Sequence, residues 1–183
     1  LNSFCDQVAS SEPVPSCGAT ACVCASLGLA LLRMAIHKSS DQEQVDSEPD
    51  LSIRAEQLLN LMKAHADNDV RTFGAFIEEA AAGSSLHSRQ HTLNITLGSL
   101  AAARSCFEGI ALAHSAVSSV KKALRCDVVS SAVMMHASLT ALLINVDTDA
   151  GNLARCSRTE ELIRTRADLQ SQADELLARL RRI

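Results

Sequence analysis

The sequence contains neither tryptophan nor tyrosine, and its four phenylalanines are its only aromatic residues. Bases of a nucleic acid would therefore find almost no aromatic surface for stacking. The formal net charge is −4, and no stretch of the chain forms a basic face that could bind phosphates. We therefore expect no nucleic-acid partner.

Turn-forming residues are also scarce, with only seven glycines and three prolines. Alternating β-branched residues, which are typical of strands, are few. Hydrophobic residues make up 47% of the chain, and alanine, leucine and serine form its apolar faces, a composition that favours closely packed helices. The 183 residues fit one domain spanning 1–183. We predict an all-α fold, an up-and-down bundle of five to six helices.

The pattern of apolar residues places these helices along the chain. Polar residues 38–50 are expected to form a loop, Gly83-Ser84-Ser85 to end a helix, and residues 147–152 to form a turn. The expected helices are 1–9, 17–37, 51–82, 92–120, a helix that Asp127 can cap and that ends near 146, and 153–183.

The last of these helices repeats apolar residues at seven-residue spacing. Its stripe contains Leu162, Leu169, Leu176 and Ile183, with Ala173 and Leu180 beside them. Such a stripe predicts packing against the bundle or against a second subunit.

No apolar run is expected to span a membrane, because Arg33 and His37 interrupt the first one. The N-terminal residues show no signal-peptide pattern. The seven cysteines are odd in number and include no C-x-x-C pair, so we expect reduced thiols and a cytoplasmic protein. The chain also has no zinc signature, P-loop, dinucleotide fingerprint or nucleophile elbow, and we expect no metal.

Asp69 is the best candidate for a catalytic residue. It falls within a helical stripe of apolar residues: Met62, Ala66, Phe73, Phe76 and Ala80. Burial raises the pKa of a carboxyl group towards the range that a general acid or base needs near neutral pH. A purely structural aspartate paired with Arg71 or Arg104 is the alternative.

Three further features allow both a functional and a structural interpretation. The Ser/Pro-rich segment before Gly18 leads into a helix N-terminus, whose free N–H groups suit an anion. Asp127 precedes a helix and is explained by capping alone. His65 and Asp69 have the i, i+4 spacing that can share a metal, but two ligands are too few, and a core histidine is the more common case.

Several segments together resemble the cyclodeaminase/cyclohydrolase family, which includes formiminotransferase-cyclodeaminases and methenyltetrahydrofolate cyclohydrolases. The first is Ala9-Ser10-Ser11-Glu12-Pro13-Val14-Pro15, followed by Gly18 and an Ala/Leu-rich helix with Met34 near its end. The others are Asp69-Val70-Arg71-Thr72-Phe73, the helical segment from Leu100 to Cys106, Asp127, and Asn145-Val146. The resemblance extends over nearly the whole chain.

The resemblance implies an enzyme of one-carbon folate metabolism, with a tetrahydrofolate derivative as its substrate and a homodimeric assembly. Asp69 would be the proton-transfer group. Ser11, Pro15 and Gly18 would shape the pterin site, and Asp127 and Asn145 would contact the folate.

The chain departs from the family pattern at Ser16, Cys17 and Val129, where the family carries glycine, and at Ser99, where it carries proline. Two alternatives follow: a member that has lost catalysis and acts as a helical interaction or dimerisation module, and a member with a changed substrate. The sequence does not choose between the deaminase and hydrolase reactions.

Overall fold

The computed structural model describes residues 2–39, 49–81, 88–153 and 156–183. Within these residues there are six α-helices, one short 3₁₀ turn and no strand, which confirms the predicted all-α bundle. The elements are α1 (Asn2–Val8), α2 (Cys17–Ser39), α3 (Pro49–Ala81), α4 (Ser88–Ala116), η1 (Lys122–Leu124), α5 (Arg125–Ala150) and α6 (Ser157–Leu180).

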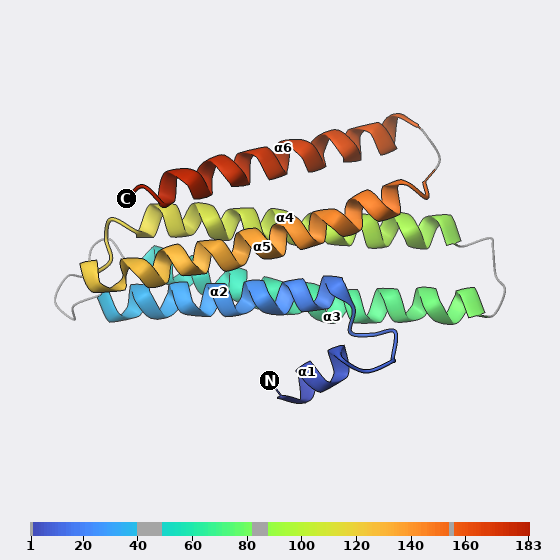
Figure 1. Cartoon of the computed structure of the whole chain (residues 1–183), viewed down its shortest axis with the longest axis horizontal. Helices are drawn as coiled ribbons and strands as arrows, with labels where there is room; N and C mark the ends of the chain where they lie inside the picture. Colours follow the sequence, from blue (N-terminus) through green and yellow to red (C-terminus); the bar gives the residue numbers. More distant parts are fainter. Residues whose placement is uncertain (1, 40–48, 82–87, 154–155) are drawn as a thin grey trace.

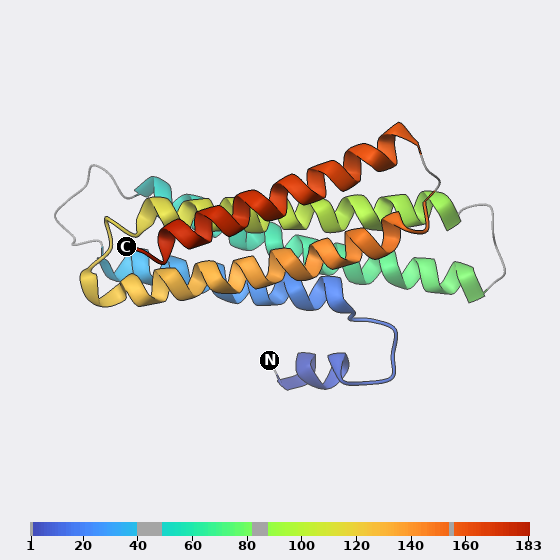
Figure 2. The ribbon, with the colours of Figure 1, turned by 45° about the horizontal axis from the view of Figure 1, so that its top comes forward.

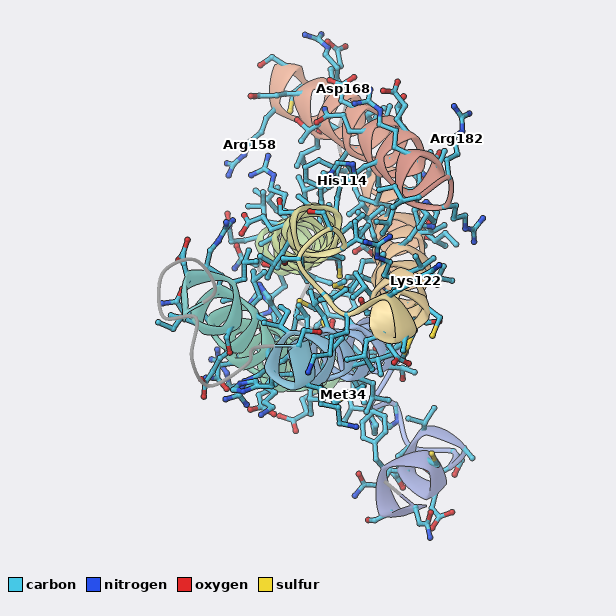
Figure 3. The ribbon with its side chains drawn as sticks, turned by 90° about the vertical axis from the view of Figure 1, so that its left-hand side faces the viewer. Met34, His114, Lys122, Arg158, Asp168 and Arg182 are labelled. Atoms are coloured by element: carbon cyan, nitrogen blue, oxygen red, sulfur yellow. The ribbon has the colours of Figure 1, made fainter. Side chains whose placement is uncertain are left out.

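Helices α2 to α5 form the core, and each lies antiparallel to the next (Figure 1). Helix α2 packs against α3 and α5, and α4 fills the opposite corner between the same two helices. Helix α6 forms an outer layer over α5 and α4 (Figure 2). The end-on view in Figure 3 shows α6 on one side of this core and α1 standing apart on the other.

Small side chains allow the core helices to approach closely. Ala25, Ala35, Ala103 and Ala113 are completely buried. At Gly28 a Cβ would lie only 3.0 Å from the carbonyl oxygen of Ser131, so α2 and α5 nearly touch there. The chain therefore builds its core with few aromatic residues, as its composition predicts.

Helix α1 is separate from this core. None of its described residues is buried, and Val8 remains 38% exposed. The segment from Ala9 to Ser16 connects it to α2 along the outside of the bundle (Figure 1).

The predicted boundaries around α5 were wrong in two respects. The residue that precedes α5 is Leu124, and Asp127 lies inside the first turn, where its charge is favourable but its side chain caps nothing. At the other end, residues 147–150 belong to the helix rather than to a turn. The predicted loop at 38–50 was too long at both ends, because residues 38–39 belong to α2 and residues 49–50 belong to α3; its remaining residues, 40–48, and the predicted helix end at Gly83-Ser84-Ser85 lie outside the described residues.

The heptad pattern of α6 is only half correct. Leu162 and Leu169 are buried, but Leu176 is half-buried, and Ile183 lies beyond the end of α6 at Leu180 and is 62% exposed. An α-helix has 3.6 residues per turn, so a seven-residue stripe rotates away from a straight contact by about 20° per repeat. The contact with the bundle therefore passes to Ala173, Leu177 and Leu180, which are buried.

In the part of the chain that the structure describes, three helices are long and apolar enough to cross a membrane, judged by length and composition alone: Cys17–Ser39, Gln90–Ala116 and Lys122–Ala150. The result for α2 contradicts the expectation that Arg33 and His37 make its apolar run too short to span a membrane. Both residues lie close to the C-terminal end of α2 and leave a long apolar stretch before them. About half of each apolar window is buried inside the bundle, at 50%, 56% and 44% respectively.

Candidate functional site

The side chain of Asp69, from the middle of α3, meets the N-terminus of α2. Its Oδ2 accepts a hydrogen bond of 2.9 Å from the backbone N–H of Ala19, and the hydroxyl of Ser16 lies 3.5 Å from the same oxygen. The N-terminus of α2 thus lies against a carboxyl group of the protein itself. Gly18 and Ala19, both buried, lie directly against it.

Burial and hydrogen bonding act in opposite directions on Asp69. Desolvation raises the pKa of its carboxyl group, and the hydrogen bonds from Ala19 and Ser16 lower it by a smaller amount. The net effect is a raised pKa, the direction that proton transfer near neutral pH requires.

The arginines considered as structural partners of Asp69 make other contacts. Arg71 donates a hydrogen bond of 2.6 Å to Asn68 Oδ1. Arg104 is exposed and lies beside Arg158 and Glu161, at a groove between α4 and α6. The contacts of Asp69 are thus to the start of α2.

The site lies at an open end of the core, because α3 and α4 extend beyond the point where α2 begins (Figure 1). The apolar stripe around Asp69 becomes less buried there. Met62 and Ala66 are buried, whereas Phe73 and Phe76 are half-buried and stack on one another with ring centroids 6.2 Å apart. Ala80 is exposed, so the stripe is a core face only in its first half.

A small polar cavity lies inside the bundle next to Asp69. Its polar walls come from α3 and α4: His65, Asn68, Asp69, Thr72, Asn94 and Ser99. Cys22 of α2 and Leu142 of α5 close its other sides. His65 lies 3.2 Å from the hydroxyl of Ser105, and desolvation lowers the pKa of its ring, which favours a neutral imidazole.

The C-terminal end of α5 brings a second carboxyl group towards the site. Leu142, Asn145 and Asp149 follow one another at i, i+3 and i+7, so they share the face of α5 that reaches the cavity. Desolvation and the charge of Asp69 both raise the pKa of Asp149. Sequence reasoning missed Asp149 because it assigned this residue to a turn; continuing the helical register from Asn145 would have found it.

The other predicted site residues are distributed unevenly. Pro15 and Ser16 line an outer groove of about 450 Å³ between α2 and α5, next to the start of α2. Ser11 is exposed on the connecting segment.

Asp127 lies at the opposite end of the bundle, where the Lys121 N–H donates a hydrogen bond to Ser39 at the end of α2. The 23 residues of α2 separate the two ends by roughly 35 Å, at about 1.5 Å per residue.

The described residues include no group of three or more His, Cys, Asp or Glu side chains placed to hold a metal ion. His136, on α5, contacts Asp174 of α6 at 2.6 Å. His114 is half-buried on α4.

Comparisons with known proteins agree with the resemblance seen in the sequence. The family model described as formiminotransferase-cyclodeaminase matches residues 1–168. Comparison with curated protein sequences finds no significant match. Among solved structures, a formiminotetrahydrofolate cyclodeaminase from Thermotoga maritima superposes with a TM-score of 0.91 and 18% sequence identity.

That superposition covers 100% of this chain and 93% of the Thermotoga chain, so the two share the whole fold. The family model covers most of the chain, including the segment before α2, Asp69, and α5 with its Asn145. The chain therefore belongs to the formiminotransferase-cyclodeaminase family.

Proposed function

We propose that this protein is a formiminotetrahydrofolate cyclodeaminase, with Asp69 as its proton-transfer group. The observation that carries the proposal is the setting of Asp69: a carboxyl group with a raised pKa, held at the open end of the bundle between the start of α2 and a polar cavity. Family membership supplies the folate-related substrate class.

In this reaction N10 of 5-formiminotetrahydrofolate attacks the formimino carbon and forms a tetrahedral carbon between two nitrogens. Asp69 would take the proton from N10 and return it to the former imino nitrogen. One further proton from solvent converts that nitrogen into the leaving group, and ammonia departs to give the 5,10-methenyltetrahydrofolate cation. Asn145, on the α5 face that reaches the cavity, would hydrogen-bond the pterin edge.

The residues before α2 would shape the pterin site. Pro15 and Ser16 line the outer groove and Gly18 lies against Asp69, which supports a role for this segment in positioning a ligand beside the carboxyl group. A folate contact by Asp127 stays a prediction; within one chain, Asp127 is too distant to share a ligand with Asp69.

The test is direct because 5,10-methenyltetrahydrofolate has its own absorption band. Purified protein is mixed with 5-formiminotetrahydrofolate, and the growth of that band and the release of ammonia are followed together. Appearance of both supports the proposal. Opening of added 5,10-methenyltetrahydrofolate to the 10-formyl compound, without deamination, would assign the hydrolase reaction instead. If neither reaction occurs and calorimetry with tetrahydrofolate and 5-formyltetrahydrofolate shows no binding, the enzymatic proposal is wrong.

We also propose that the protein is a cytoplasmic homodimer that contacts its partner through the outer face of α2 and α5. Leu27 is 47% exposed on α2 and Ile144 is 55% exposed on α5, so both helices present a large apolar side chain to the outside. Light scattering should give twice the chain mass. The substitution Leu27→Lys should then shift the protein towards a monomer, whereas Ile53→Lys at an exposed position of α3 should not.

A further inference from the structure

The inner wall of the cavity beside Asp69 contains a hydroxyl group with no hydrogen-bond partner among the described residues. Ser99, on α4, is 5% exposed, and its Oγ is buried and unpaired. A buried hydroxyl without a partner is costly, so such groups in folded proteins nearly always contact protein or an ordered water.

The hydroxyl group of Ser99 differs in its hydrogen bonding from three other hydroxyl groups on the same helix. Thr96, Ser105 and Ser115 each donate a hydrogen bond to the backbone carbonyl four residues earlier, with distances of 2.7, 3.3 and 3.1 Å. This is the usual way for a helical hydroxyl to be satisfied. Ser99 lacks this bond and lines the cavity shared with Asp69.

The cavity has the size and polarity of a single water site. Its water-accessible volume is about 20 Å³, which is close to the minimum of roughly 10–15 Å³ that one water molecule needs. A buried water also needs two to four polar partners. Asp69 and Ser99 supply two, and the side chains of Asn68 and Asn94 lie in the same wall.

We propose that this cavity holds one ordered water molecule between Ser99 Oγ and the carboxyl group of Asp69, and that Ser99 is thereby a positioning residue for Asp69. The proposal deepens the proposed function, but the water site itself needs no folate. Asp69 Oδ2 is already held from the side of α2 by Ala19 and Ser16. The water would hold the carboxyl group from the α4 side.

The water would also change the charge balance of Asp69, because a donor to a carboxylate favours its ionised form. The titratable groups around Asp69 are Cys17 and Cys22 of α2, His65 of α3 and Asp149 of α5. Desolvation raises the pKa of Cys22 to about 12, so this thiol stays neutral. Removing the water removes a donor to the Asp69 carboxylate, so it should raise the pH midpoint at which Asp69 titrates.

The experiment compares Ser99→Ala with the unchanged protein by carbon NMR of aspartate-labelled samples, with the Asp69 signal assigned from Asp69→Asn. We expect Ser99→Ala to raise the Asp69 midpoint by about one pH unit. The matched control is Ser131→Ala, which also removes a buried helical hydroxyl, but one that already donates to the carbonyl of Val128. The control should leave the Asp69 midpoint unchanged.

A high-resolution crystal structure of the unchanged protein gives a second readout that does not depend on the variant folding. Density for a water within hydrogen-bond distance of both Ser99 Oγ and Asp69 supports the proposal. A Ser99 hydroxyl that donates to the carbonyl of Ile95, with an empty cavity, overturns it. An unchanged Asp69 midpoint in a folded Ser99→Ala variant overturns it as well. If the midpoint rises but no folate reaction is found, the water site stands and the proposed function fails.

Discussion

Gly18 and Asp69 lie in direct contact, closely enough that a Cβ at position 18 would fall 2.1 Å from Oδ1 of Asp69. The carboxyl group therefore rests on the one residue of the α2 N-terminus that has no side chain. Any other residue at position 18 would push Asp69 away from the Ala19 N–H.

This contact predicts the effect of Gly18→Ala. The added methyl group should displace Asp69 and destabilise the fold by about 1–3 kcal/mol, the usual range for overpacking. It should also abolish any turnover, because the carboxyl group leaves its position. Urea unfolding and the methenyl assay measure the two effects. Gly74→Ala on α3 is the control, since a Cβ there meets nothing within 4 Å, and it should stabilise the helix by about 0.5–1 kcal/mol.

Replacing Asp69 by asparagine separates its chemical role from its structural role. Asn keeps an oxygen that can accept from the Ala19 N–H but cannot exchange a proton, so turnover should fall by about 10²–10⁴-fold while the fold persists. Circular dichroism and the methenyl assay test this together. Asp67→Asn, an exposed change two residues earlier, should keep the wild-type rate. A catalytically normal Asp69→Asn protein would show that this carboxyl group is only structural.

The same substitution should change how stability depends on pH. The folded-state pKa of Asp69 is raised above its ordinary value of 3.8, so the folded protein binds more protons than the unfolded chain between the two values. This group therefore makes the free energy of unfolding decrease as pH rises through that window. Asp69→Asn should remove this contribution, which urea unfolding at a series of pH values would detect as a flatter profile.

Asp149 should respond to the charge of Asp69. The negative charge of Asp69 contributes to the raised pKa of Asp149, and repulsion between two carboxylates is mutual. Asp69→Asn should therefore lower the titration midpoint of Asp149, and Asp149→Asn should lower that of Asp69. Carbon NMR of labelled aspartates measures both. Midpoints that stay fixed in both variants would mean that the two carboxyl groups do not interact.

The cysteines should differ strongly in their reactivity. All seven are free thiols; Cys22 and Cys106 are buried, and desolvation raises the pKa of both. Cys156 is fully exposed, and hydrogen bonds from Thr159 lower the pKa of its thiol. Iodoacetamide should label Cys156 first and Cys22 and Cys106 only after unfolding, as mass spectrometry would show. Thr159→Val should slow the labelling of Cys156; equal rates at all exposed cysteines would contradict this order.

The sequence contained most of the information needed to predict the fold, because helical periodicity and composition both report the local environment of each residue. Asp69 was found in this way, as a carboxylate within an apolar stripe. Asp149 was hidden because the polar run from Asp147 to Asn152 is typical of a turn, and only packing at the end of α5 keeps it helical. Leu176 misled for a geometric reason, since an exact heptad does not follow a straight helix, and Ile183 misled because α6 already ends at Leu180.

The contacts to the start of α2 are long-range in sequence, and no periodicity could predict them. Ser16 and Ala19 meet a side chain more than 45 residues further along the chain, with separations of 53 and 50 residues. Ser99 shows the same limit, because only the three-dimensional structure reveals that its hydroxyl lacks a partner.

The bond between Ala19 and Asp69 makes the first turn of α2 and the geometry of the site a single cooperative unit. The Ala19 N–H in this turn has its hydrogen bond only while α3 is packed against α2, and Asp69 is held in position only while the turn is helical. Fraying of this helix end and release of the carboxyl group are then one opening event with one free energy, so the exchange rate of the Ala19 amide hydrogen reports how often the site comes apart.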